Sequence, residues 1–205
     1  MLAVLDYGIG NLASAQKAFA HVGAPAELTA DPSKIRDAAA VVLPGVGAFG
    51  ACMTALREAN LEDAVHEAVE SGKPFLGICV GMQMLFDESD EDEAVGGLGI
   101  IPGRVEWIPA GVKRPQMQWN IVDMQRSDPM FASMPSETWM YFVHSLHGVP
   151  SDGSYVVATC EYGSTLNVAF RKDNVFATQF HPEKSGKLGL QLLRNFWSIA
   201  TESAR

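Results

Sequence analysis

One cysteine of this 205-residue chain stands in a setting that suits a nucleophile. Cys79 is the centre of Gly77-Ile78-Cys79-Val80-Gly81, which follows the apolar run Pro74-Phe75-Leu76 and precedes a helix-like run at residues 82–86. A strand, a glycine-flanked turn and a helix are typical of a nucleophile elbow, in which the chain turns sharply and exposes the central side chain. A helix N-terminus also favours the thiolate over the thiol. We therefore expect Cys79 to be the nucleophile of an acyl-transfer reaction.

A histidine near the end of the chain could be the base that this cysteine needs. His181 follows a strand-like run at residues 176–180 and precedes Pro182 and Glu183. If the segment stays extended, His181 and Glu183 point to the same side, because side chains alternate along a strand. Glu183 could then accept a hydrogen bond from one imidazole nitrogen and leave the other facing Cys79. Alone, such a pair is usually a surface pair, so the predicted triad depends on the cysteine turn.

Acyl transfer also requires hydrogen-bond donors for the negatively charged oxygen that forms in the reaction. The backbone N–H of Val80, directly after the nucleophile, is one candidate. A second could come from Pro44-Gly45-Val46-Gly47, at the end of another predicted strand, because its glycines let the backbone approach a substrate closely. From that loop alone, an ordinary glycine-rich turn is the simpler interpretation.

The first half of the chain alternates between short apolar strands and amphipathic helices. Residues 3–6 and 40–43 read as strands, and the second is a continuous apolar run of the kind buried in a parallel sheet. Apolar residues recur at helical spacing in residues 11–22, 49–59 and 61–69. This alternation predicts an α/β fold of three layers, a doubly wound and mostly parallel sheet with helices on both faces.

The second half of the chain is richer in strands. They are expected at residues 104–108, 120–123, 140–143, 155–158 and 175–178. Some of them should pair antiparallel at one edge of the sheet, and residues 188–199 read as a closing amphipathic helix. The acidic run at residues 87–93 is most simply a solvated loop. Because no repeat or linker interrupts the chain, we expect a single domain over residues 1–205.

Composition excludes several classes of function. Hydrophobic residues make up 47% of the chain and charged residues 19%, as in globular proteins. The net charge of −9 argues against nonspecific nucleic-acid binding, and no apolar run is long enough for a membrane span. Cys52, Cys79 and Cys160 are an odd number without metal-type spacing, so we expect a reducing, cytoplasmic location, no metal and no cofactor. Cys52 and Cys160 are expected to be structural.

The motifs around the cysteine and the histidine resemble those of a known family. Gly77-Ile78-Cys79-Val80-Gly81-Met82-Gln83 and Gln179-Phe180-His181-Pro182-Glu183 are similar to the signatures of the class I, or triad, glutamine amidotransferases. Members of that family hydrolyse glutamine through a glutamyl thioester and pass the ammonia to a synthase site. The resemblance implies a triad of Cys79, His181 and Glu183, an oxyanion site at Gly45, Val46 and Val80, and L-glutamine contacts at Gly47, Gln83 and Ser145.

Further segments resemble one branch of that family, which serves a cyclase in histidine biosynthesis. They include Asp6-Tyr7-Gly8-Ile9-Gly10-Asn11-Leu12 and Tyr141-Phe142-Val143-His144-Ser145. The resemblance implies a heterodimer in which ammonia passes to a (β/α)8-barrel cyclase subunit. The positions that it places at the interface with this partner are Asn11, Trp119, Asn120, Tyr141 and Lys184.

Two departures from the branch pattern concern the same segment. Where the branch commonly has His-Met-Gly-Trp-Asn, this chain has Gln116-Met117-Gln118-Trp119-Asn120, and we expect Gln116 and Gln118 near the interface. Val80, where leucine is frequent, is a milder change.

Two alternatives stay open: a glutaminase of anthranilate, pyridoxal phosphate or guanylate synthesis, and a catalytically silent scaffold subunit. The segment at residues 6–12 argues against the first and the intact triad against the second.

Overall fold

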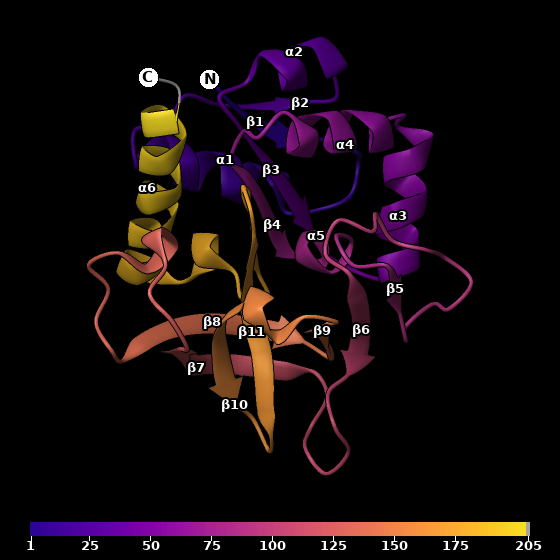
Figure 1. Cartoon of the computed structure of the whole chain (residues 1–205), viewed down its shortest axis with the longest axis vertical. Coiled ribbons are helices and arrows are strands. Elements are labelled where there is room, and N and C mark those ends of the chain that lie inside the picture. Colours follow the sequence, from indigo (N-terminus) through magenta and orange to yellow (C-terminus); the bar gives the residue numbers. More distant parts are fainter. Residues whose placement is uncertain (204–205) are drawn as a thin grey trace.

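The computed structural model describes residues 1–203 and is built around one large twisted sheet (Figure 1). Nine strands follow one another in the order β2-β1-β3-β4-β12-β11-β10-β7-β8. The first five are parallel to one another: β2 (Ala26–Thr29), β1 (Leu2–Leu5), β3 (Ala40–Gly45), β4 (Phe75–Cys79) and β12 (Val175–Thr178). The carboxyl ends of β3, β4 and β12 therefore lie together at one edge of the parallel part, where ligands of open α/β sheets bind.

The rest of the large sheet is antiparallel. Its strands are β11 (Thr165–Lys172), β10 (Val156–Glu161), β7 (Gln116–Met124) and β8 (Thr138–His144). A second, three-stranded sheet consists of β5 (Glu88–Ser89), β6 (Gly103–Trp107) and β9 (Leu146–Pro150). The predicted fold class, a mostly parallel doubly wound sheet with an antiparallel edge, is confirmed.

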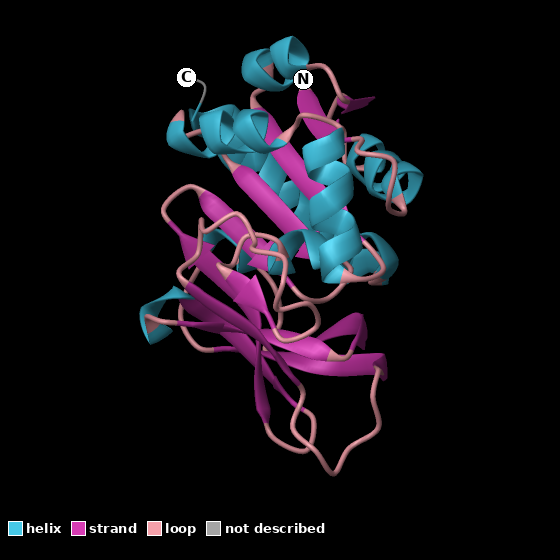
Figure 2. Ribbon diagram, turned by 90° about the vertical axis from the view of Figure 1, so that its right-hand side faces the viewer, coloured by secondary structure: helices cyan, strands magenta, loops and turns pink. Residues whose placement is uncertain are grey.

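Helices cover both faces of the parallel strands, and the antiparallel strands extend beyond them (Figure 2). They are α1 (Leu12–His21), α2 (Pro32–Asp37), α3 (Phe49–Glu58), α4 (Glu62–Glu70), α5 (Val80–Gln83) and α6 (Gly186–Ser203). Helices α1 and α6 pack together through Phe19 and Phe196, whose ring centroids are 6.0 Å apart. The closing helix thus packs against the first helix of the chain.

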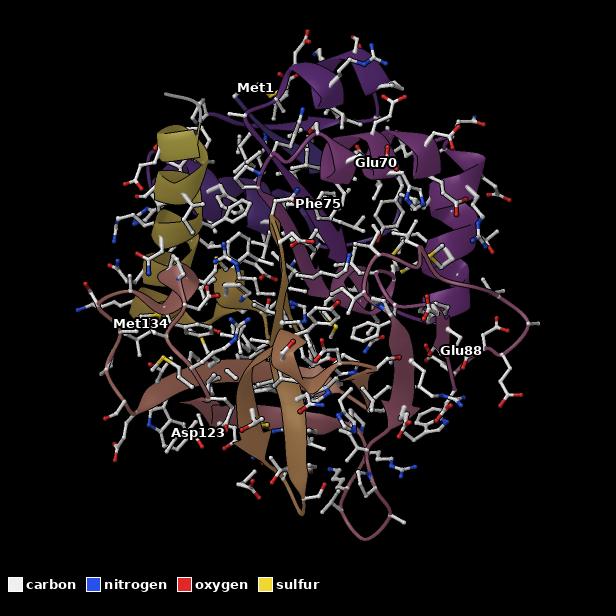
Figure 3. The ribbon with its side chains drawn as sticks, in the orientation of Figure 1. Met1, Glu70, Phe75, Glu88, Asp123 and Met134 are labelled. Atoms are coloured by element: carbon white, nitrogen blue, oxygen red, sulfur yellow. The ribbon has the colours of Figure 1, made fainter. Side chains whose placement is uncertain are left out.

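The parallel strands form the centre of the hydrophobic core. Every residue of β1, β3 and β4 is buried, as expected for strands covered on both faces. Phe75, the first residue of β4, is fully buried, and its side chain lies inside the molecule in Figure 3. Burial of a side chain of this size contributes about 1.5–3 kcal/mol. The strand that ends in Cys79 is therefore held firmly in place.

Several sequence-based expectations about elements were wrong. The helix expected over residues 82–86 is the single turn α5, because the Met84 and Leu85 carbonyls accept hydrogen bonds from Leu98 and Ile101 at 2.8 Å instead of continuing the helix. The acidic run contains β5, which pairs with β6.

Candidate active site

Cys79 ends strand β4 with a strained backbone conformation at a sharp turn. Its φ of 56° and ψ of −115° are rare for a residue with a side chain, and such strain is concentrated at functional sites. Neither flanking glycine position has room for a side chain. A Cβ on Gly77 would lie 2.9 Å from Met82 Cα, and one on Gly81 only 1.9 Å from the Leu43 carbonyl oxygen. The geometry is that of a nucleophile elbow.

His181 reaches the site because β12 is the direct neighbour of β4 in the sheet. Its Nδ1 lies 2.7 Å from Oε1 of Glu183, and the two side chains are 2% and 4% exposed. The segment does not stay extended as expected, since a 3-10 helix (η3, Pro182–Lys184) follows His181. That single turn still brings the carboxylate back to the imidazole. The predicted hydrogen bond is present, but its geometry has a different origin.

The electrostatics of His181 favour the imidazolium. Burial by itself lowers the pKa of His181, but interactions with Cys79 and the Glu183 carboxylate outweigh burial and raise it to about 9. Nε2 of His181 is buried and has no hydrogen-bond partner among the described residues. It is the ring nitrogen left free for the nucleophile and substrate, because Nδ1 is occupied by Glu183.

The glycine-rich loop predicted as an oxyanion site lies directly beside Cys79. The parallel register pairs Gly45 with Cys79, and a Cβ on Gly45 would be only 2.6 Å from the Gly81 nitrogen. The loop is held from the core side by Tyr7, whose hydroxyl donates to the Pro44 carbonyl oxygen at 2.6 Å. Burial raises the pKa of Tyr7, so this hydroxyl stays a donor.

The other side of the loop is held by Cys52, a buried cysteine that was expected to be structural. The Cys52 thiol lies 3.4 Å from the carbonyl oxygen of Val46 and donates to it. Burial raises the pKa of Cys52, which keeps the thiol protonated. Gly47, the last residue of the loop, has a φ of +100° that glycine adopts without strain.

A pocket of about 430 Å³ opens in front of Cys79. Among the predicted residues, its lining includes Asn11, Val46, Gly47, Cys79, Val80, Gln83, Ser145, His181 and Lys184. Glu183 lies behind His181 and does not line the pocket, and Gly45 is buried beneath the loop. The structure therefore brings the predicted nucleophile, base, oxyanion loop and glutamine contacts into one place.

The predicted interface residues fall into two groups. Asn11 and Lys184 lie at the pocket, whereas Trp119 and Tyr141 lie on neighbouring strands β7 and β8 with ring centroids 6.1 Å apart. Trp119 is 47% exposed, which is unusual for so large an apolar side chain. Asn120 is different, because its side chain donates to the Glu161 carbonyl oxygen at 2.9 Å and so is tied to the sheet.

Gln116 and Gln118, both predicted to lie near the interface, differ in burial. Gln116 is fully buried at the start of β7, and its side chain is 2.8 Å from Nε2 of His144, whereas Gln118 is exposed. Nδ1 of His144 lies 2.7 Å from the Leu146 carbonyl oxygen. Burial lowers the pKa of His144 to about 4, so the ring is neutral and Nδ1 carries the proton. His144 lines the pocket beside Ser145, so this polar cluster is part of the pocket wall.

Two residues of the site were missed from the sequence. Glu91, read as part of a solvated acidic loop, lines the pocket and accepts a hydrogen bond from the Phe49 N–H at 2.7 Å. Gln179 is fully buried between Gln83 and Cys79 and forms hydrogen bonds with both. Glu91 gave no signal among its acidic neighbours, and Gln179 stood within a recognised motif but was given no function.

Within residues 1–203, no group of three histidine, cysteine, aspartate or glutamate side chains is placed to hold a metal ion. In the same part of the chain, no helix combines the length and apolar character needed to cross a bilayer.

Comparison with known proteins agrees with this geometry. The sequence profile described as "Glutamine amidotransferase class-I" matches residues 3–199. The chain therefore belongs to the class-I glutamine amidotransferase family. Two solved structures with that fold cover nearly the whole chain with a TM-score of 0.77. They are "Structure of PurLQS from Thermotoga maritima" (20% identical, 100% of this chain and 98% of that one) and "Crystal structure of glutamine amidotransferase" (22% identical, 98% of each chain).

Relatives at much higher identity have a more specific name. A protein of Syntrophotalea carbinolica called "Imidazole glycerol phosphate synthase subunit HisH" is 49% identical over 203 residues, covering 96% of this chain and 98% of that protein. The protein of the same name from Moorella thermoacetica is 47% identical over 198 residues, covering 97% and 94%. The similarity runs from end to end in both cases.

Proposed function

We propose that this chain is the glutaminase subunit of an imidazole glycerol phosphate synthase and that Cys79, His181 and Glu183 carry out its chemistry. The observation that carries the proposal is the buried imidazole–carboxylate pair, 2.7 Å apart, which directly follows the strand next to the strained cysteine turn. Relatives at 44–49% identity with this subunit name support the choice within the family.

The reaction begins with attack of the Cys79 thiolate on the side-chain amide carbon of L-glutamine. Negative charge moves to the amide oxygen, and the donors that we propose for it are the Val80 N–H and a peptide N–H from the Gly45-Val46 loop. The His181 imidazolium gives its Nε2 proton to the leaving nitrogen, and ammonia departs from the glutamyl thioester. Glu183 keeps the imidazole in the orientation that this transfer needs.

The second half of the reaction releases glutamate. Nε2 of His181, now unprotonated, takes a proton from a water molecule that attacks the thioester carbon. Collapse of the tetrahedral intermediate restores the Cys79 thiolate and the His181 imidazolium. No cofactor is required for these steps. The pKa of about 9 suits this use, since the imidazolium is populated at neutral pH before the ammonia leaves.

The pocket lining accounts for recognition of an amino-acid substrate. Gly47, Gln83 and Ser145 offer backbone and side-chain contacts to L-glutamine. Glu91 adds a carboxylate to the same pocket, and its charge suits the α-ammonium group of the substrate. One oxygen of Glu91 is already fixed by the Phe49 N–H, which orients the other.

The partner in this proposal is a (β/α)8-barrel cyclase subunit that receives the ammonia in a heterodimer. The exposed Trp119 and the half-buried Tyr141 support a docking face on β7 and β8, and Asn11 and Lys184 connect this face to the pocket. Aromatic side chains are enriched at the centres of such interfaces.

We also propose one domain over residues 1–205, and a cytoplasmic location that suits three unpaired thiols.

The test is glutaminase activity of the purified chain, with and without a cyclase subunit and its ribonucleotide substrate. Activity that appears with the cyclase and disappears in Cys79→Ala is the expected result. Activity that is independent of the cyclase would assign the chain to a different amidotransferase. A complex that binds but hydrolyses no glutamine would overturn the catalytic roles and favour the scaffold alternative.

A further inference from the structure

Gln179 connects the nucleophile to a residue of the substrate pocket. It follows strand β12, is fully buried, and its backbone N–H donates to the Val168 carbonyl oxygen at 2.9 Å. Its side-chain Nε2 lies 3.8 Å from Cys79 Sγ, within hydrogen-bonding range of a sulfur acceptor. Its Oε1 accepts from Gln83 Nε2 at 3.1 Å. A single buried amide thus contacts both groups.

The chemistry of the thiolate decides which way this amide faces. Oxygen and nitrogen of an amide have nearly the same shape, so orientation has to follow from the hydrogen-bond partners. A thiolate only accepts hydrogen bonds, and Gln179 must therefore present its NH₂ group to Cys79. Its carbonyl oxygen then faces Gln83, which must present its own NH₂ group in turn. The carbonyl oxygen of Gln83 is left for a donor in the pocket.

We propose that Gln179 is a positioning residue that stabilises the Cys79 thiolate and fixes the Gln83 amide as a hydrogen-bond acceptor for the substrate. The inference rests on the proposed glutaminase function, because it concerns the same nucleophile and pocket. It has a consequence for substrate orientation. The Gln83 carbonyl oxygen then faces the pocket and can accept from an N–H group of glutamine, since the Gln83 NH₂ group is turned toward Gln179.

The proposal is tested by the rate at which iodoacetamide alkylates Cys79 in the isolated chain as a function of pH. Gln179→Met keeps the volume but removes the donor. We expect the pH midpoint of alkylation to rise by about one unit, which is a tenfold slower reaction below the midpoint. Peptide mass spectrometry separates Cys79 from the buried Cys52 and Cys160.

Two matched variants show whether the shift is specific. Gln83→Met removes the amide that is hydrogen-bonded to Gln179 but leaves the Gln179 donor to Cys79. Gln116→Met removes a different fully buried glutamine, which contacts His144. Neither should move the midpoint of alkylation by more than about 0.3 units, because both keep the Gln179 NH₂ donor to Cys79. Gln179→Asn, whose shorter amide withdraws from Cys79, should shift it as Gln179→Met does and serves if the methionine variant does not fold.

Two results would overturn the proposal. One is a folded Gln179 variant with the wild-type midpoint, and the other is an equal shift in Gln116→Met, which would indicate a general effect of losing a buried amide. Alkylation needs neither glutamine nor the cyclase. A chain that hydrolysed no glutamine would therefore fail the glutaminase assay and still report on Gln179, so the two failures are distinguishable.

Discussion

Replacing Glu183 by glutamine measures how much the neighbouring charge contributes to the basicity of His181. Glutamine keeps an oxygen for the Nδ1–H at 2.7 Å but removes the negative charge, and the pair is almost unscreened because the side chains are 2% and 4% exposed. A hydrogen bond to a charged partner contributes about 1.5–3 kcal/mol and a neutral one about 0.5–1.5. The loss is therefore about 1–2 kcal/mol, or about one unit in the pKa of His181.

The direction of the effect follows from the raised pKa. Wild-type His181 is an imidazolium up to about pH 9, so a lower pKa means that the proton is lost earlier on the alkaline side. The alkaline limb of kcat/KM should move down by about one pH unit in Glu183→Gln. The pH dependence of folding stability has the same direction. The imidazolium stabilises the fold fully below pH about 6.5, and this contribution disappears as the pH rises through about 9.

The assay is the pH dependence of glutaminase kcat/KM in the complex with the cyclase. Glu62→Gln is the control, since Glu62 pairs with Arg57 at the surface, 2.9 Å away, and does not contact the pocket. A second measurement is the unfolding free energy of wild type and Glu183→Gln, whose difference should shrink between pH 7 and pH 10. An alkaline limb that coincides with that of the wild type would refute the reasoning.

Two further substitutions test the elbow and the docking face. Gly81→Ala places a Cβ 1.9 Å from the Leu43 oxygen and should destabilise the fold by at least about 2 kcal/mol in denaturant unfolding, whereas Gly153→Ala, where the space is open, should change little. Equal stability of the two variants would contradict the steric argument. Trp119→Ala should weaken cyclase binding at least about thirtyfold in calorimetry and leave the alkylation of Cys79 unchanged. Unchanged affinity would remove Trp119 from the interface.

The parallel strands could be predicted because burial on both faces leaves a simple pattern. Residues 40–43 are a continuous apolar run, and they lie within the fully buried strand β3. Strand β2 was missed, since three of its four residues are only partly buried and its Ala-Glu-Leu-Thr sequence has no clear period. Strand β9 contains His147 and Gly148, which read as a loop. Its conformation depends on pairing with β6, a contact that no local pattern reveals.

Some residues of the site lie in local sequence motifs, whereas others are positioned only by contacts between distant parts of the chain. Cys79, His181 and Glu183 stand in short motifs whose local conformation carries their chemistry, so sequence alone could indicate them. Glu91 reaches the pocket only because its loop folds back onto the start of α3, where the Phe49 N–H fixes it. Gln116 and His144 are far apart in sequence, and the β7–β8 register alone pairs them. Such positions depend on the whole sheet.

The segment that carries the catalytic base also closes the outer edge of the large sheet. β8 is the last strand in the sheet order, and an unpaired edge strand is a template on which other chains can aggregate. At Tyr141, both backbone groups are occupied: the carbonyl oxygen accepts from the His181 N–H at 3.1 Å, and the N–H donates to Ser185 Oγ at 3.0 Å. Ser185 in turn donates to the His181 carbonyl oxygen at 2.6 Å. Variants that loosen this segment should therefore lose solubility as well as activity, and selection for a non-aggregating chain acts on the same residues as selection for catalysis.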